Sequence, residues 1–353
     1  MERLTCIIFA GGAGTRLWPM SRKNSPKQFA SIKQNQSTLQ MAVERISYFG
    51  LENLYISTNA AYAHLVKEQV PDLLDSQVFL EPAKRDQGPA VGLTLLRLKQ
   101  QGITGPIAIL WSDHLMDHPD SFRDALSHAG KLVEQQPNRF IFLGETPRFP
   151  NHNLGWMHIG KKTAEGTHEF LGWKYRPEVP ACKELFESKE WLWNTGYFVT
   201  DIDFLLDLYK RLQPELYSAL LTMAGDESLV ERDYGTLPAI SFDNAIIEKT
   251  DLSEGAVLSL NLGWSDPGTL YAFKEAFAPD EKSNYAVGQT IDLGSTDSFI
   301  YNEEPKKLVS TIGLEGMIVV NTKDAILVCK KEDVPRLKEL LKKIEEEKKE
   351  SYL

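Results

Sequence analysis

A glycine-rich segment near the N-terminus combines the residue types that bind phosphate. Residues 7–29 read IIFAGGAGTRLWPMSRKNSPKQF, in which an apolar run ends in GGAG at residues 11–14. Glycine lets the backbone approach an anion closely, and successive N–H groups form an anion-binding concavity. Four basic residues follow: Arg16, Arg22, Lys23 and Lys27. The combination of glycines and basic residues indicates a nucleotide-phosphate site. A GGAGTR sequence by itself is weak evidence, because a glycine-rich turn after a first strand is more often a plain tight turn. It matches neither G-x-G-x-x-G nor the P-loop G-x-x-x-x-G-K-[ST].

The composition of the chain limits which partners such a site can bind. The chain has 353 residues, 42% of them apolar and 25% charged, which is typical of a globular protein of one large domain or two. Its formal net charge is −10. Broad binding to nucleic acid or to an anionic membrane therefore lacks its usual electrostatic support, and we expect neither partner. Anions must instead be bound by a local cluster of basic groups and backbone N–H donors.

Cysteine usage and hydropathy point to the cytoplasm. Cys6, Cys182 and Cys329 are odd in number and far apart, with no C-x-x-C pair, so neither a disulfide framework nor a cysteine-rich zinc site fits. The apolar stretch Cys6–Ala10 is too short for a signal peptide. No run approaches the roughly 18 apolar residues of a transmembrane helix. We therefore expect a cytoplasmic protein.

Alternating strand and helix patterns position the glycine-rich segment. Five apolar runs have strand length and lack alternating polarity, as in a sheet covered on both faces: Leu4–Phe9, Leu54–Ser57, Val78–Leu80, Ile107–Trp111 and Phe140–Leu143. Helical spacing lies between them, as at Leu39, Ala42, Val43 and Ile46. This alternation predicts an α/β fold of right-handed βαβ units with a mostly parallel sheet. The glycine-rich segment follows its first strand.

After about residue 150 the pattern of strands and helices becomes irregular. Four candidate strands predict a mixed extension of the sheet that forms the second wall of a cleft: Gly155–Ile159, Phe170–Trp173, Tyr197–Val199 and Val257–Leu260. Past about residue 276, short strand-like segments spaced by turn residues predict a small β module. Residues 333–350 predict a charged terminal helix. We therefore expect two domains, residues 1–275 and 276–353, and we detect no strict repeat.

Several motifs along the chain resemble one family. GGAGTRLWPMSR followed by SPKQF resembles the signature of the sugar-1-phosphate nucleotidylyltransferases, specifically the mannose-1-phosphate guanylyltransferase (GDP-mannose pyrophosphorylase) branch. Further matching stretches follow in that family's order: EPAKR at 81–85 with GPA at 88–90, SDH at 112–114, GWMHI at 155–159, WNTG at 193–196, SFD at 241–243, IEK at 247–249, GWSDPG at 263–268 and NTKDA at 321–325. Together they span nearly the whole chain, so they are far more specific than any one motif.

The resemblance implies a fold and an activity. The fold is a Rossmann-like, GT-A-like mixed sheet flanked by helices, with a β-helix-like C-terminal module. The activity is transfer of GMP from GTP to α-D-mannose 1-phosphate, giving GDP-mannose and pyrophosphate. This chemistry needs positioning and charge neutralisation more than covalent help. Asp113 and Asp266 are implied to hold one Mg²⁺. Arg16 and Lys27 are implied to neutralise the triphosphate; we expect Lys27 at the surface of the cleft, contributing little to folding.

Binding residues are carried over from the matching motifs. The nucleotide-binding set is Gly11, Gly12, Gly14, Thr15, Arg16, Lys27, Arg85, Gly88, Pro89, Ser112 and Asp113. The sugar-phosphate set is Gly155, Arg176, Asn194 and Glu248. In the first set the glycine turn and the Arg85 loop are expected to flank the guanine. In the second set Arg176 is expected to bind phosphate, and Asn194 the sugar hydroxyls.

The sugar side departs most from the family pattern. Where the family has EKP, this chain reads Tyr175-Arg176-Pro177, and the residue before the SDH motif is Trp111 rather than proline. Another hexose or heptose 1-phosphate therefore stays open as the substrate. So does a non-catalytic sugar-nucleotide sensor, although the metal carboxylates and Lys27 are present. A nucleotide-dependent oxidoreductase would need the G-x-G-x-x-G fingerprint, which is missing. A homodimer is also left open.

Overall fold

The strand that precedes the glycine-rich segment lies within a group of parallel strands. The computed structural model describes residues 4–12, 14–22, 26–33, 36–278 and 280–353, with only the backbone at 15 and 31–33. β1 (Thr5–Phe9) pairs in parallel with β4 (Leu54–Asn59) and β6 (Pro106–Trp111), and β5 (Val78–Glu81) extends the sheet beyond β4. The predicted strands in this region, including β7 (Phe140–Glu145), are confirmed. β1, β4, β6 and β7 are buried along most of their length, as uniformly apolar strands require, whereas β5 at the edge of the sheet is buried at alternate residues.

Antiparallel strands complete the mixed sheet. Its remaining members are β8 (Gly155–Lys162), β9 (His168–Tyr175), β10 (Trp191–Asp201) and β11 (Gly255–Leu260). In the described part of the chain the sheet has nine strands in the order β5-β4-β1-β6-β10-β7-β11-β9-β8. β10 pairs antiparallel with both β6 and β7, whereas β11 returns parallel to β7. The mixed extension expected after residue 150 is therefore confirmed.

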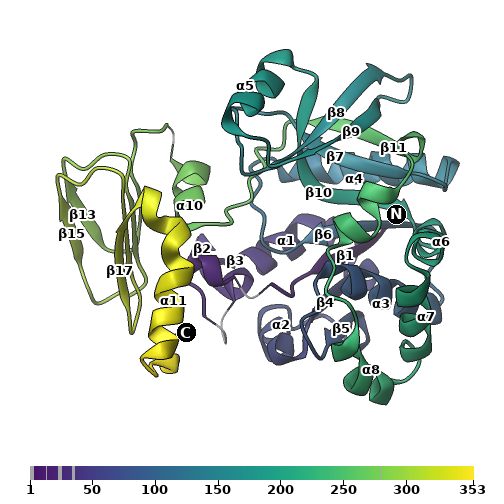
Figure 1. The fold of residues 1–353 in the computed structure, drawn as a ribbon, viewed down its shortest axis with the longest axis horizontal. Helices are drawn as coiled ribbons and strands as arrows, with labels where there is room; N and C mark the ends of the chain where they lie inside the picture. Colours follow the sequence, from purple (N-terminus) through teal and green to yellow (C-terminus); the bar gives the residue numbers. More distant parts are fainter. Residues whose placement is uncertain (1–3, 13, 23–25, 34–35, 279) are drawn as a thin grey trace. The chain divides into compact units, whose positions relative to one another are not determined.

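Helices cover both faces of this sheet. Ile7 and Phe9 of β1 belong to the main apolar cluster, and the intervening Ile8 points to the opposite face. The cluster side is covered by α3 (Gln87–Gln100), α6 (Ile202–Leu212), α7 (Pro214–Met223), α8 (Glu227–Asp233) and α9 (Phe242–Ala245), most of which Figure 1 shows grouped together. On the sheet's other side α4 (Pro119–Gln135) packs on β6, β7, β10 and β11. The remaining helices of this region are α1 (Thr38–Ile46), α2 (Ala63–Gln69) and α5 (Val179–Ser188).

Contacts divide the chain into two units. The first holds the large sheet and comprises residues up to 11, 40–112 and 116–264. The second comprises residues 12–39, 113–115 and 265–353, so the glycine-rich segment belongs with the C-terminal residues. Two short strands, β2 (Ser31–Lys33) and β3 (Gln36–Ser37), pair within it. The predicted division at residue 275 stays a prediction.

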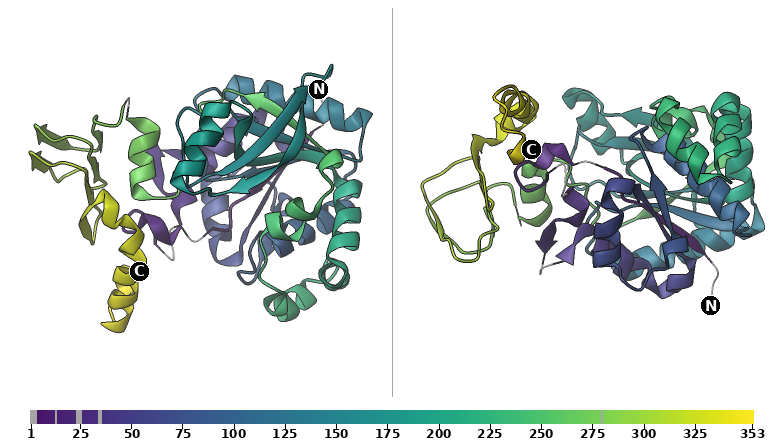
Figure 2. Two further views of the ribbon diagram at one scale, coloured as in Figure 1. Left: turned by 45° about the horizontal axis from the view of Figure 1, so that its top comes forward. Right: turned by 90° about the horizontal axis from the view of Figure 1, so that it is seen from below.

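The second unit contains a coil of short strands. Its members are β12 (Tyr285–Val287), β13 (Thr290–Leu293), β14 (Phe299–Asn302), β15 (Val309–Ile312), β16 (Met317–Asn321) and β17 (Ile326–Lys330). Phe299 pairs in parallel with Ile318, and Thr290 with Val309, each one turn of the coil later; the right-hand view of Figure 2 shows these turns overlying one another. The sequence shows this repeat only weakly, through FIYN at 299–302 and IVVN at 318–321. The β-helix-like module is confirmed.

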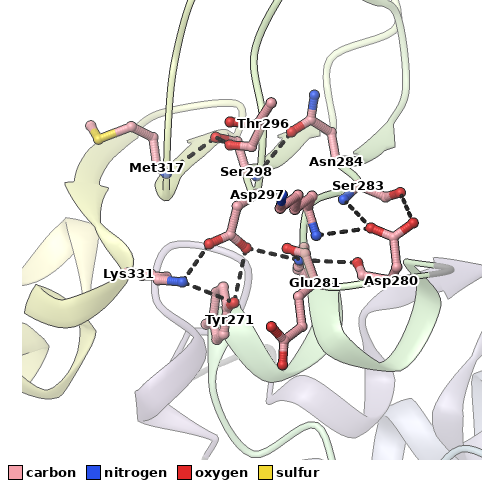
Figure 3. Close-up of polar contacts among 12 residues, drawn as sticks. Tyr271, Asp280, Glu281, Ser283, Asn284, Thr296, Asp297, Ser298, Met317 and Lys331 are labelled. Atoms are coloured by element: carbon pink, nitrogen blue, oxygen red, sulfur yellow. Dashed lines mark hydrogen bonds and ion pairs between the residues drawn. The ribbon is translucent and has the colours of Figure 1, made fainter.

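An ionic cluster joins the coil to α10 (Leu270–Phe277) within the second unit. Lys274 is 1% exposed, and its Nζ donates to Oδ1 of Asp297 at 2.8 Å. Asp297 also accepts from Lys331 and from the hydroxyl of Tyr271, as Figure 3 shows. A buried lysine requires such partners, because an unpaired buried charge is costly. The cluster therefore anchors the first strands of the module on α10.

The chain ends in a helical segment shorter than expected. Residues 331–336 form a 3₁₀ helix, and α11 (Leu337–Glu346) follows it. Pro335 lies at the junction, where its missing N–H and fixed φ interrupt a continuous α-helix. Among the described residues, none of the helices is both long enough and apolar enough to cross a membrane.

Candidate active site

Lys27, Asp113 and Asp266 converge in the second unit. The Nζ of Lys27 lies 2.5 Å from Oδ2 of Asp113 and 3.9 Å from Oδ1 of Asp266. A short antiparallel bridge brings the two carboxylates together, because Leu115 and Ser265 exchange both backbone hydrogen bonds at 3.0 Å. Asp113 precedes one bridge residue and Asp266 follows the other, so residues far apart in the chain meet. The structure therefore brings together the two carboxylates implied for Mg²⁺ and the lysine implied for the triphosphate, and their roles stay predictions.

Mutual charge sets the protonation of this group. Burial raises the pKa of Asp113, but the charges of Lys27 and His114 and the hydrogen bond from Lys27 together outweigh burial and lower the pKa to about 2. Burial lowers the pKa of Lys27, but Asp113 and then Asp266 outweigh it, so the pKa is raised above its ordinary value. The side chain of Asp113 is 28% exposed. At neutral pH the group therefore contains a protonated Lys27 and an ionised Asp113, and the side chains of both Asp113 and Asp266 reach solvent.

Lys27 is more enclosed than its sequence context indicates. It begins a 3₁₀ helix, η2 (Lys27–Phe29), and is only 9% exposed, so the expected position at a cleft surface is wrong. Gly14 packs directly on it: a Cβ on Gly14 would lie 2.9 Å from Cβ and from N of Lys27. The φ of Gly14 is +62°, a region that favours glycine. Gly14 is thus required by both backbone conformation and packing.

Arg16 lies close to the same carboxylates but is exposed. It belongs to η1 (Thr15–Leu17), and a Cβ on Gly268 would lie 3.8 Å from its Nη atoms and 3.7 Å from Oδ1 of Asp266. The guanidinium is therefore beside the Asp266 turn and free to reach an anion in solvent. The side chain of Thr15 lies outside the described part of the chain, as do Ala13 and Lys23 of the glycine-rich segment. Gly12 is exposed, with open space where a Cβ would lie.

A buried carboxylate lies next to Gly11 in the first unit. Glu81 ends β5 and is 9% exposed, and its Oε1 lies 3.6 Å from where a Cβ on Gly11 would be. Its Oε2 accepts from the hydroxyl of Tyr234 at 2.8 Å. Burial raises the pKa of Glu81 to about 7, against the opposing effect of the Tyr234 hydrogen bond. In the sequence, Glu81 is only the first residue of the EPAKR motif, and no role was predicted for it. Its signal was a charged residue ending a buried strand.

The loop that follows Glu81 is built partly for packing. Gly88 is buried in the first turn of α3, where its N–H donates to the carbonyl of Ile240 at 2.9 Å and its carbonyl accepts from Tyr209. A Cβ on Gly88 would approach that Ile240 carbonyl to 2.8 Å. Pro89 is buried beside it. Gly88 and Pro89 therefore shape this loop and offer no spare N–H to a base, because the N–H of Gly88 is already donated and proline has none. Their contact with nucleotide stays a prediction.

Two further residues of the predicted nucleotide set have distinct surroundings. Arg85 is half-buried, and within the described part of the chain its Nε is buried without a hydrogen-bond partner. Such an atom is costly unless a ligand or solvent satisfies it. Ser112 is buried, and its N–H donates to the carbonyl of Phe9, which continues the pairing of β1 with β6. Contact of either residue with nucleotide stays a prediction.

The structure brings three of the four predicted sugar-side positions together. Gly155 pairs with Tyr175 across β8 and β9, and a Cβ on Gly155 would lie 3.5 Å from Cβ of Asn194. Oδ1 of Asn194 accepts from the N–H of Gly196 at 2.8 Å, and among the described residues its Nδ2 group has no hydrogen-bond acceptor. Arg176 follows Tyr175, is exposed, and lies over the Tyr175 ring at 5.2 Å. This group offers an amide, a phenol and a guanidinium on one surface.

Glu248 is not part of that group in the described contacts. It is exposed on the 3₁₀ helix η8 (Ile247–Lys249) and accepts from Nδ2 of Asn244 at 2.9 Å. Burial raises the pKa of Asp243 to about 6, and the charges of Glu248 and Asp86 add to that effect. Glu248 is thus grouped with the loop that begins α3. Its predicted sugar role stays a prediction without support from these contacts.

A carboxylate that sequence reasoning missed holds the backbone just before Asp266. Glu145 ends β7, and its side chain is fully buried. It accepts from the N–H groups of Leu262 at 2.8 Å and Trp264 at 3.2 Å, and from Arg148 at 2.9 Å. Burial raises the pKa of Glu145, and these donors oppose it. Like Glu81, it is a charged residue ending a buried strand, which is the signal that could have identified it.

These features define a nucleotidyl transferase. The sequence model of the nucleotidyl transferase family matches residues 5–283, and that of the MannoseP isomerase/GMP-like beta-helix domain matches residues 288–344. The chain belongs to the nucleotidyl transferase family, and it carries that family's fold on one polypeptide with the β-helix-like module. Nucleoside triphosphates and sugar 1-phosphates are the substrates of such enzymes.

Several relatives of this chain have names that refer to mannose 1-phosphate. A Vibrio cholerae serotype O1 protein provisionally named mannose-1-phosphate guanylyltransferase is 30% identical over 98% of this chain and 75% of its own length. Alginate biosynthesis protein AlgA of Pseudomonas syringae pv. tomato is 30% identical over 97% of this chain and 72% of its own. A crystal structure from Thermus thermophilus, described as a mannose-1-phosphate geranyltransferase, is 25% identical, with a TM-score of 0.88 over 97% of this chain and 99% of that one.

Proposed function

We propose that this protein transfers GMP from GTP to α-D-mannose 1-phosphate, forming GDP-mannose and pyrophosphate. A phosphate oxygen of the sugar phosphate attacks the α-phosphorus, and the bond from the α-phosphorus to the β-bridging oxygen breaks. The observation that carries the proposal is the convergence of Lys27, Asp113 and Asp266, which come from three separate family motifs. The names of relatives that match nearly the whole of this chain support the substrate pair.

The cations of the glycine-rich segment suit this displacement. Negative charge accumulates on the α-phosphate oxygens and on the leaving pyrophosphate, and fixed positive groups stabilise it most where solvent is excluded. Lys27 is buried and held by two carboxylates, so its ammonium costs little reorganisation. Arg16 is exposed beside Asp266 and can follow the triphosphate as it binds. We assign α-phosphate stabilisation to Lys27 and leaving-group neutralisation to Arg16.

Asp113 and Asp266 fit the Mg²⁺ that the family implies. Their oxygens are directed at one cationic position, since both approach the same ammonium, and carboxylate oxygens are the ligands that Mg²⁺ prefers. When bound, the ion supplies positive charge to the phosphate oxygens. Because the pKa of Asp113 is about 2, that carboxylate is ionised and ready for a cation at any physiological pH.

Glu81 is suited to read the guanine edge. A guanine presents N1–H and N2–H donors side by side, and a carboxylate accepts both, whereas adenine presents an acceptor at N1. Oε2 of Glu81 is held by Tyr234, and Oε1 faces Gly11 of the glycine-rich turn. We therefore assign the guanine preference to Glu81 rather than to the backbone of Gly88, whose N–H is already donated.

On the sugar side we assign phosphate binding to Arg176 and hydroxyl binding to Nδ2 of Asn194. Tyr175 is 71% exposed and stands where the family has a carboxylate, next to Gly155 and Arg176. A phenol contacts sugar hydroxyls with a different donor and acceptor pattern from a carboxylate. This substitution favours a second candidate, transfer to another hexose or heptose 1-phosphate by the same chemistry. We place either reaction in the cytoplasm, and a homodimer stays part of the proposal.

A substrate matrix tests the proposal. GTP, ATP, UTP and dTTP are each combined with α-D-mannose 1-phosphate, other hexose 1-phosphates and heptose 1-phosphates in Mg²⁺, and pyrophosphate release is measured. We expect the highest kcat/KM for GTP with mannose 1-phosphate. A different best sugar supports the second candidate, and the absence of turnover with every pair overturns the enzymatic function in favour of a sensor.

A further inference from the structure

The turn between β16 and β17 holds an arginine of the glycine-rich segment. Nη2 of Arg22 donates to Oδ1 of Asp324 at 2.5 Å and to Oγ1 of Thr322 at 3.3 Å. Thr322 closes the turn through Ala325, exchanging backbone and side-chain hydrogen bonds with it. Burial raises the pKa of Asp324, but the hydrogen bond and charge of Arg22 and the hydrogen bond from Thr322 together outweigh burial and lower the pKa. The carboxylate of Asp324 in the β module is therefore paired with Arg22 of the glycine-rich segment.

A short chain of contacts runs from Arg22 to Lys27. The preceding residue, Ser21, is 1% exposed, and its hydroxyl donates to the carbonyl of Gly14 at 2.5 Å. Gly14 in turn packs so closely on Lys27 that even a methyl group would collide with it. The ammonium of Lys27 is the group that pairs with Asp113. Displacing Arg22 would therefore shift the backbone that positions Lys27.

A second contact from the C-terminal end restrains the same segment. Nε1 of Trp18 donates to the carbonyl of Tyr352 at 2.6 Å, and the Arg22 guanidinium lies 5.4 Å from the Trp18 ring centroid. Trp18 is 6% exposed. Residues 18–22 are thus held from the module side by one ionic contact and one backbone contact. All of these residues belong to the second unit.

We propose that Asp324 is a positioning residue for nucleotidyl transfer, acting through Arg22 on the segment that carries Lys27. The β-helix-like module is then a working part of the triphosphate site and not an appendage to it. This inference rests on the proposed function for its kinetic readout. It assigns Asp324 to the nucleotide half of the reaction, so sugar-phosphate binding is independent of Asp324.

The experiment compares Asp324→Asn with Asp333→Asn. Asp333 is a carboxylate of the same region, paired with Arg336 at 3.2 Å, and the two aspartates are 43% and 42% exposed. We expect Asp324→Asn to raise KM for GTP and lower kcat, together by about tenfold in kcat/KM, because a half-exposed charged hydrogen bond is lost. KM for the sugar phosphate stays within about twofold, Asp333→Asn behaves as wild type, and Asp324→Glu recovers most of the activity.

A double-mutant cycle with Arg22→Gln completes the test. If Asp324 acts through Arg22, the double variant is no worse than Arg22→Gln alone. Additive losses, an unchanged Asp324→Asn, or equal losses for both substrates overturn the proposal. Calorimetric GTP binding without sugar separates it from the proposed function. If wild type turns over no pair, weaker GTP binding by Asp324→Asn than by Asp333→Asn still supports the positioning role, and equal binding rejects it.

Discussion

The ammonium of Lys27 lies 2.5 Å from the carboxylate of Asp113, so the glycine-rich segment and the loop after β6 meet through an ion pair. We predict that Lys27→Met lowers kcat by about 10²–10³, the usual cost of removing a preorganised electrostatic group. It should also lower the free energy of unfolding by about 1–3 kcal/mol, because Asp113 and Asp266 are left close together without their cation.

The double variant Lys27→Met/Asp113→Asn separates the two effects. Urea denaturation should show most of the lost stability regained, since the unpaired charge is gone, whereas steady-state kinetics should show no recovery of kcat. If Lys27→Met unfolds at the wild-type urea concentration, the ion pair contributes nothing to folding and the burial argument is wrong.

The fall in the free energy of unfolding at acid pH should depend on Asp113. Its pKa is about 2 in the folded protein and near 3.8 when unfolded, so its contribution is present above about pH 4 and is lost as pH falls toward 2. Urea unfolding between pH 4 and pH 2 should show the wild-type free energy falling more steeply than that of Asp113→Asn. Parallel pH profiles for the two proteins would show that Asp113 has no depressed pKa.

The length and uniformly apolar composition of the runs were enough to predict the central strands of the sheet, but they carry no information on contacts between distant residues. Leu4–Phe9 and Ile107–Trp111 are buried on both faces, so their composition alone marks them as central strands. The roles of Glu81 and Glu145 depend on Tyr234 and Leu262, which are more than 100 residues away and have no periodic relation to them. The motifs did identify Lys27, Asp113 and Asp266, but not the bridge between Leu115 and Ser265 that brings them together.

Glu81 should make guanine recognition dependent on pH. Its folded pKa of about 7 lies above the ordinary 4.5, so folding favours the protonated form, and the wild-type free energy of unfolding falls as pH rises from about 4.5 to 7. Only the ionised form accepts both guanine donors. We predict that kcat/KM for GTP rises through about pH 7 in wild type.

Glu81→Gln is the matched test of that prediction. Kinetics with GTP and with ITP, which lacks the 2-amino group, should show wild type preferring GTP by about tenfold or more, and the variant preferring it far less. The variant's pH profile should also be flat near neutrality. Undiminished discrimination by Glu81→Gln would assign base recognition to another group.

Arg176 should act on the sugar phosphate alone. Loss of a charge-assisted phosphate contact costs about 1.5–3 kcal/mol, so Arg176→Ala should raise KM for the sugar phosphate roughly ten- to a hundredfold. KM for GTP should barely change. Lys161→Ala, which removes an exposed cation at the opposite end of the β8–β9 pair, is the control and should leave both constants unchanged. Equal increases in both constants would mean that Arg176 supports the fold of this region instead.

Removal of divalent metal should abolish turnover reversibly. Asp113→Asn and Asp266→Asn should each lower kcat by about 10²–10³ and raise the Mg²⁺ concentration needed for half-maximal rate. Equilibrium dialysis of Mg²⁺ in the presence of GTP gives a readout independent of turnover, and both variants should bind less metal. Full activity after chelation would remove the assigned role of both carboxylates.

The most direct measurement is product identification in a single reaction of the wild-type protein with GTP, α-D-mannose 1-phosphate and Mg²⁺. Mass spectrometry and pyrophosphate quantitation should show GDP-mannose and pyrophosphate formed in equal amounts, and added pyrophosphate should drive the reverse reaction to GTP. Formation of GDP or free phosphate in place of pyrophosphate, or no nucleotide sugar at all, would contradict the assignment of this site to guanylyl transfer.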